Sequence, residues 1–152
     1  MDVKERYVKL QKKYGLPSYD DMVRDFDIDL IGKDENVMRE VQKKMFDKID
    51  FFARTLEALV QPDSTYANMK EASSLNVSEQ QLAKRLFAEL MHIARAFTIN
   101  SLEYNEEEFA RFISSLNDKW QKIKPELKVI LVSLKEAWKK QKDIEEDKGY
   151  FG

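Results

Sequence analysis

A single apolar stripe in the last third of the chain constrains the fold more than any other feature of the sequence. Between residues 106 and 146, apolar side chains return every three or four positions, which is the repeat of one helix face. The stripe keeps its phase across Pro125, where no Gly, Asn or Asp is present to form a turn. We therefore predict one helix over residues 106–146, kinked where Pro125 cannot donate a hydrogen bond to the carbonyl of Gln121. The stripe consists of Phe109, Ile113, Leu116, Trp120, Ile123, Leu127, Ile130 and Leu134.

Capping signals predict shorter helices in the rest of the chain. A helix N-cap is usually Ser, Thr, Asp or Asn, and a Glu or Gln three residues later completes a capping box. Ser78 with Gln81 fits this pattern, and so does Asn105 with Glu108. Two such starts, separated by one helix and a short loop, predict an antiparallel helical hairpin. The other predicted N-caps are Asp2, Ser18 and Asp34, and the predicted helix ends are Gly15, Pro62 and Gly149.

The fold class that follows is all-α: an antiparallel helical bundle with a long, kinked C-terminal helix and short N-terminal helices. Composition agrees, because charged residues make up 36% of the chain and only four glycines and three prolines are present. A single domain of 152 residues buries enough surface to fold without covalent staples. We expect N-terminal helices and a docking linker at 1–33, the bundle core at 34–148 and a tail at 149–152.

Composition also narrows the environment and the partners. The chain has no cysteine, which excludes disulfides and thiolate chemistry. Its 26 basic and 28 acidic residues give no global attraction to nucleic acid or to an anionic membrane. The aliphatic run at 129–132 is far shorter than the roughly 20 residues that span a bilayer. The charged N-terminus lacks the apolar core of a signal peptide. These features predict a soluble, cytoplasmic protein that does not enter a membrane.

Glu89 and His92 raise the question of a metal site, because a Glu-x-x-His pair on a helix is part of the ligand set of ferritin-like bundles. Such bundles also need carboxylates that point inward from neighbouring helices. At about 100° per residue, His92 lies about 140° from the apolar face of its own helix. We therefore favour a partly covered histidine paired with Glu89, predict no metal and no cofactor, and keep a metal-binding bundle as the alternative.

The stretch DFDIDLIGKDEN resembles the start of a calcium-binding loop, because Asp25, Asp27 and Asp29 alternate. Such a loop needs Gly at its sixth position and Glu at its twelfth, and here these positions hold Leu30 and Asn36. We instead predict an extended linker that docks onto the helices through apolar side chains. The docking side chains would be Phe26, Ile28 and Leu30.

Conventional catalysis has no support in the sequence. A catalytic triad needs a base held by an orienting group, and the chain contains one histidine. The four glycines are scattered and form no phosphate-binding loop. We predict that the protein is not an enzyme and has no small-molecule substrate.

The predicted lengths of the helices suggest self-association. A helix over residues 106–146 is about 60 Å long, and partner helices of about 40 Å or less cannot cover its whole stripe. Apolar surface left uncovered on a monomer usually marks association, so we expect a homodimer or another protein partner. The predicted contact residues are Leu127, Ile130, Leu134, Trp138, Tyr150 and Phe151.

A row of lysines lies beside the stripe, within about 60° on the helical wheel. The row consists of Lys124, Lys128, Lys135, Lys139 and Lys142, and residues 119–142 hold eight lysines against two acidic residues. These lysines can keep a solvated flank soluble, pair with acidic ends of another subunit, or bind an anionic partner. Nucleic acid is the less favoured partner, because arginine forks and exposed aromatic rings are not evident. The favoured role is a non-catalytic, homo-oligomeric interaction or scaffolding module.

Overall fold

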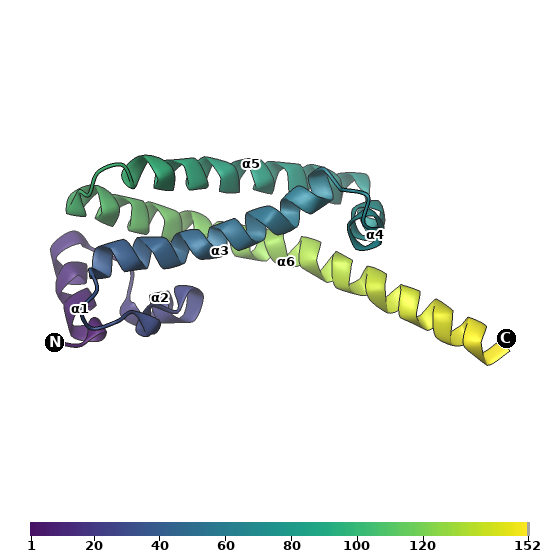
Figure 1. Cartoon of the computed structure of the whole chain (residues 1–152), viewed down its shortest axis with the longest axis horizontal. Coiled ribbons are helices and arrows are strands. Elements are labelled where there is room, and N and C mark those ends of the chain that lie inside the picture. Colours follow the sequence, from purple (N-terminus) through teal and green to yellow (C-terminus); the bar gives the residue numbers. More distant parts are fainter. Residues whose placement is uncertain (152) are drawn as a thin grey trace. The chain divides into compact units, whose positions relative to one another are not determined.

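The computed structural model describes the backbone of residues 1–151 and the side chains of residues 1–147. Within this range the chain forms six α-helices and one 3-10 turn, and no strand (Figure 1). The all-α prediction is therefore confirmed. The elements are α1 (Val3–Tyr14), α2 (Tyr19–Phe26), η1 (Ile28–Leu30), α3 (Val37–Val60), α4 (Tyr66–Ser74), α5 (Val77–Asn100) and α6 (Glu106–Phe151).

The helix α6 runs unbroken through Pro125, as the phase of its apolar stripe predicts. All eight stripe residues, from Phe109 to Leu134, are buried. The predicted end at Gly149 is wrong, because α6 continues to Phe151. A lone glycine lowers helix stability by only about 1 kcal/mol, which does not by itself end a helix. The kink at Pro125 and the antiparallel order of the bundle stay predictions.

The chain divides into two compact units that share the helices α3, α5 and α6. Unit 1 comprises residues 1–52 and 90–121, and unit 2 comprises residues 53–89 and 122–152. The prediction of a single domain is not tested by this division.

The core of unit 1 is built around Trp120, which is almost fully buried. Its ring lies 6.0 Å from the ring of Phe26 and 5.7 Å from that of Phe52. Asp25 is buried beside them, and its backbone carbonyl accepts a hydrogen bond of 2.6 Å from Lys48 Nζ. Aromatic packing and one buried carboxylate thus hold α2 in unit 1.

Two left-handed residues shape the N-terminal segment. Gly15 (φ 67°) ends α1, as predicted, and Asp27 (φ 56°) ends α2. After Asp27 the chain makes the 3-10 turn η1, so the predicted extended linker is wrong there. The turn buries Ile28 but leaves Leu30 exposed, and Ile31 is buried in its place. The tighter turn shifts the inward face by one residue relative to an extended strand.

Unit 2 packs the ends of α3 and α6 with the start of α5, and its buried side chains include Leu56, Leu86, Leu127 and Ile130. The helix α4 adds no buried residue. It is held by the Trp138 indole, whose N–H donates to Glu71 Oε2 at 2.9 Å and whose ring meets Tyr66 at 6.2 Å. The hydrogen bond and the ring contact between α4 and α6 therefore both involve Trp138, which lies one turn beyond the last stripe residue, Leu134.

Two predicted N-caps are displaced by two residues. Asn36, and not Asp34, caps α3 through its Oδ1, which accepts from the N–H of Arg39. Asn76, and not Ser78, caps α5: its Oδ1 accepts from Glu79 N–H at 2.8 Å, while Glu79 Oε1 accepts from Asn76 N–H at 3.1 Å. This reciprocal pair satisfies two donors, so it outcompetes the box predicted at Ser78. The predicted cap at Asn105 is confirmed.

No helix in the described part of the chain combines the length and apolar character needed to cross a membrane.

Candidate functional site

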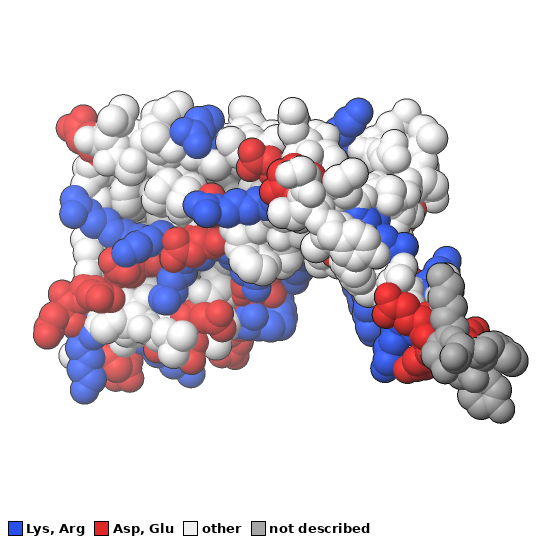
Figure 2. Space-filling view, turned by 45° about the vertical axis from the view of Figure 1, so that its right-hand side comes forward, with Lys and Arg blue, Asp and Glu red and all other residues white. Residues whose placement is uncertain are grey.

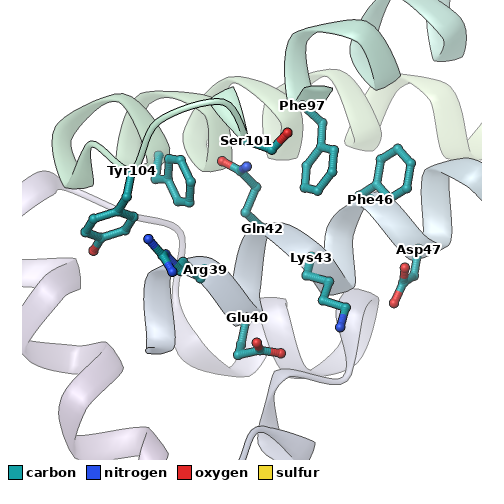
Figure 3. Close-up of a pocket in the computed structure, with 10 residues that line it drawn as sticks. Arg39, Glu40, Gln42, Lys43, Phe46, Asp47, Phe97, Ser101 and Tyr104 are labelled. Atoms are coloured by element: carbon teal, nitrogen blue, oxygen red, sulfur yellow. The ribbon is translucent and has the colours of Figure 1, made fainter. Parts of the chain in front are cut away.

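An aromatic-lined cavity of about 490 Å³ opens on unit 1, between the start of α3 and the connection from α5 to α6. This volume lies in the range of sites that hold small molecules or anchoring side chains. Figure 3 shows its residues arriving from α3 on one side and from α5 and α6 on the other. The lining residues are Arg39, Glu40, Gln42, Lys43, Phe46, Asp47, Phe97, Ser101, Tyr104 and Phe109.

Two aromatic pairs form the walls of the cavity. Phe46 of α3 stacks on Phe97 of α5 with 4.2 Å between ring centroids and 17° between planes. Tyr104 packs edge-on against Phe109 at 5.1 Å, on either side of the N-cap Asn105, which is the arrangement of a hydrophobic staple. The guanidinium of Arg39 lies 4.7 Å from the centre of the Tyr104 ring, within the range of a cation–π contact. These pairs fix the walls without filling the space between them.

Gln42 lies at the floor of the cavity. Its side chain is only 1% exposed, and its Oε1 is buried without a hydrogen-bond partner. In Figure 3 the Gln42 amide points into the space between Tyr104 and Phe97, while Lys43 and Asp47 point away from it. A buried acceptor without a partner costs about 1–3 kcal/mol. The cavity therefore offers an unmet polar contact to whatever enters it.

The charged residues along the α3 edge of the cavity alternate in sign. They are Arg39, Glu40, Lys43 and Asp47, and their formal charges cancel. Among the described residues, none of the four forms an ion pair. The α3 edge of the cavity is thus neutral overall, and its charged side chains are available to form ion pairs with another molecule.

Apolar side chains stand exposed beside the cavity. Leu102 is 84% exposed and directly follows Ser101, which lines the cavity. Ile99, at the end of α5, is 67% exposed. The turn between them is held by the Ser101 hydroxyl, which donates to the Thr98 carbonyl, and by the Leu102 N–H, which donates to the Ile99 carbonyl at 3.2 Å. Exposed apolar residues thus flank the cavity-lining Ser101 in the sequence.

The surface around α5 is poor in charge. The 24 residues of α5 include five charged side chains, and Figure 2 shows uncharged residues predominating along the top of the view, where α5 runs in Figure 1. Lysine, arginine, aspartate and glutamate are interspersed over the lower part of the same view. A surface of low charge next to an apolar cavity is typical of a contact region.

The predicted pair of Glu89 and His92 is arranged differently from the expectation. His92 is exposed and not partly covered, because its helical neighbours Ile93 and Ala94 take the inward positions. The Glu89 carboxylate lies 3.9 Å from Arg85, which also pairs with Glu126. Among the residues with described side chains, no group of three or more potential ligands gathers to hold a metal ion.

The predicted partner-binding residues of α6 lie in three environments. Leu127, Ile130 and Leu134 are buried within the chain, so the expectation of an uncovered stripe at these positions is wrong. Trp138 is half-buried beneath α4. Leu127, Ile130 and Leu134 belong to the same compact unit as the end of α3 and the start of α5, so helix length alone underestimated the cover. Tyr150 and Phe151 lie outside the residues with described side chains.

The lysine row follows the exposed side of α6 for most of its length. Lys128, Lys135, Lys139 and Lys142 are exposed, whereas Lys124 is half-buried. Lys142 pairs with Glu146 one turn later at 3.9 Å. Figure 2 shows both basic and acidic side chains along the part of α6 that precedes the undescribed residues.

Sequence reasoning missed the cavity, although one signal was present. Gln42 stands four residues after Met38 and four before Phe46, on an otherwise apolar face of α3. A lone polar residue on such a face marks either a buried network or a site. Protein-family models, curated proteins and solved structures all give no match to this chain, so the cavity is interpreted from its geometry.

Proposed function

We propose that this protein is a non-catalytic helical interaction module that associates with a second copy of itself through the face around the aromatic-lined cavity. The single observation that carries the proposal is the position of Leu102, an exposed leucine beside an open apolar cavity. A two-fold interface uses the same surface on both subunits, so a projection and a cavity on one face can fill each other reciprocally. Leu102 of each copy would enter the cavity of the other.

The charges along the α3 edge support a second copy as the occupant. Arg39 and Asp47 lie about 12 Å apart along α3, at about 1.5 Å per residue. A two-fold axis near Lys43 places Arg39 of one copy opposite Asp47 of the other, twice per dimer. The same axis brings the two Lys43 side chains near each other, so the attraction rests on the two pairs of Arg39 with Asp47. A strongly charged partner would meet as many repulsive contacts as attractive ones along this neutral edge.

The proposed arrangement of the fold matches this role. In an antiparallel bundle, α5 and α6 form a hairpin whose connection is the segment 101–105. The rigid helices on both sides hold Leu102 in place before association, which lowers the entropic cost of binding. The lining residues supply apolar contacts and hydrogen bonds, which suit binding and not bond making.

Sedimentation equilibrium of paired variants tests the proposal. Leu102→Asp places a charge on the projection and is expected to abolish self-association. Leu30→Asp is the matched control, because Leu30 is 71% exposed in η1 of the same unit but does not line the cavity. Because both side chains are exposed, neither substitution is expected to unfold the protein, and circular dichroism of the two variants is the check. Equal association of the two variants, or a wild type that stays monomeric up to about 1 mM, overturns the proposal.

A second candidate role is anion binding through the lysine row. Among the described residues, the exposed Lys128, Lys135 and Lys139 form no ion pair, so their charges are available to a polyanion. A gel shift at low salt with a short nucleic acid, compared with the charge-reversed variant Lys128→Glu/Lys135→Glu, separates this role from self-association. No retention at micromolar protein rejects it.

A further inference from the structure

Among the described residues of unit 1, three side chains have a buried polar atom without a hydrogen-bond partner, namely Arg6, Gln42 and Trp120, and only Gln42 lines the aromatic-lined cavity. Gln42 is 1% exposed, its Oε1 has no hydrogen-bond partner, and its amide points into the aromatic-lined cavity, between Tyr104 and Phe97 (Figure 3). A core position of this kind is usually filled by an apolar residue, because an unmet buried acceptor destabilises the fold. The amide therefore acts against stability in the isolated chain.

Two backbone N–H groups in an exposed turn follow Leu102. Within the described chain, the backbone N–H groups of Glu103 and Tyr104 donate to no protein group, whereas those of Ser101 and Leu102 donate to the carbonyls of Phe97 and Ile99. The free donors thus follow directly after the exposed leucine. The cavity thus holds a buried acceptor without a donor, and the exposed turn beside it carries two backbone N–H groups that bond no protein group.

We infer that Gln42 is the specificity-determining contact of this site: its Oε1 accepts a hydrogen bond from the backbone N–H of Glu103 or Tyr104 of a second copy. This inference rests on the proposed function, and it adds the polar contact that selects the incoming segment. The ligand chemistry is an apolar side chain followed within two residues by a free backbone N–H. A helix cannot supply that pattern in its interior, because its N–H groups are already bonded. The site therefore recognises a turn.

The amide also fixes the register of the association. Apolar contacts between Leu102 and the aromatic walls are non-directional, so they do not by themselves select one depth of insertion. A hydrogen bond at the floor of a water-excluded cavity is directional and is strengthened by its surroundings. A second copy that enters without forming this hydrogen bond would leave the Gln42 Oε1 and its own backbone N–H buried without partners. This cost disfavours other registers of association.

Gln42→Met tests the inference, because methionine has nearly the same length and flexibility, favours helix and has no strong acceptor. The dissociation constant of self-association is expected to rise about tenfold, the usual effect of losing one buried hydrogen bond. The stability of the monomer, measured at a concentration below dissociation, is expected to stay equal or rise. A purely structural Gln42 would give the opposite pair of results: a less stable monomer with an unchanged dissociation constant.

Amide hydrogen exchange supplies a second readout that does not depend on the stability of the variant. In the wild type, exchange at Glu103 and Tyr104 is expected to slow when the protein concentration rises above the dissociation constant. In Gln42→Met, exchange at Glu103 and Tyr104 is expected to remain fast when the same fraction of the protein is associated. Exchange that slows equally in both proteins overturns the inference, as does an unchanged dissociation constant. If Leu102→Asp also leaves association unaltered, both the proposed function and this inference are wrong. If Gln42→Met alone is without effect, the inference is wrong and the proposed function still holds.

Discussion

Gln121 Nε2 donates a hydrogen bond of 2.8 Å to Asp25 Oδ2, and so joins α6 to α2 across 96 positions of sequence. The same carboxylate accepts from Arg24 Nε at 3.1 Å through its other oxygen. Asp25 is 5% exposed, so its charge depends on such donors for stabilisation. Within unit 1, this contact joins α2 to α6, while the hydrogen bond from Lys48 Nζ to the Asp25 carbonyl joins α2 to α3.

Gln121→Leu is expected to destabilise the protein by about 1.5–3 kcal/mol, because it removes a hydrogen bond to a buried charged group. Urea denaturation followed by circular dichroism measures the change. Gln141→Leu is the matched control, because the Gln141 amide bonds only Glu145 one turn away. A loss below about 0.5 kcal/mol for Gln121→Leu would show that the contact contributes little.

The observed cap of α5 predicts a contrast between two neighbouring residues. Asn76→Ala removes an N-cap side chain and is expected to lower the free energy of unfolding by about 1 kcal/mol. Ser78→Ala, at the position favoured by the sequence pattern, is expected to change it by less than about 0.5 kcal/mol, because Ser78 lies inside the first turn. Thermal denaturation of both variants decides between them. A larger loss at Ser78 would restore the cap predicted from the sequence.

Glu79 makes the stability of unit 2 depend on acidic pH. A hydrogen bond from the Ser133 hydroxyl, and then one from the Asn76 N–H, lowers the pKa of the Glu79 carboxyl below its ordinary 4.5. The folded pKa is lower than the unfolded one, so the contribution is fully present above about pH 4.5 and disappears as the pH falls through the folded value. Glu79→Gln is expected to flatten the loss of stability between about pH 5 and pH 3. Identical pH profiles of the two proteins would contradict this account.

Trp138→Phe tests how α4 is held. Phenylalanine keeps a ring beside Tyr66 but cannot donate to Glu71, so α4 is expected to open more often. Amide exchange in residues 66–74 should become about 5–10 times faster, because the variant loses one hydrogen bond that contributes about 1 kcal/mol. Glu71→Gln is the matched control, because its amide keeps an acceptor oxygen. Equal acceleration in the control would shift the cause to the charge of Glu71.

Periodicity predicted the parts of the fold that depend on one helix at a time. The phase of the stripe from Phe109 to Leu134 was enough to predict an unbroken α6 and its inward face, because burial of one face imposes a helical repeat on the sequence. Gly15 likewise predicted the end of α1, because its positive φ is a local requirement. Periodicity did not predict the helix start where two neighbouring residues can both act as the N-cap, as Asn76 and Ser78 can.

The candidate site could not be predicted in the same way. The cavity exists because the pair of Phe46 and Phe97 is separated from the pair of Tyr104 and Phe109. No sequence pattern predicts the distance between these two pairs. The expectation of an uncovered stripe failed for a related reason. The helix lengths predicted how much of α6 its partner helices could cover, but not which residues they cover. Trp138 is covered by the short helix α4, which has no buried residue of its own. Only the polarity of Gln42 marked the site in advance.

The central claim is that Leu102 of one copy occupies the aromatic-lined cavity of another, and an isotope-filtered nuclear Overhauser measurement tests it most directly. Protein labelled at leucine methyls is mixed with unlabelled protein, so that only contacts between copies are detected. The account predicts cross-peaks from the Leu102 methyls to aromatic protons of Phe46, Phe97 or Tyr104 and a mass of twice 18.0 kDa. Absence of these cross-peaks in a sample that sediments at 18.0 kDa would contradict it.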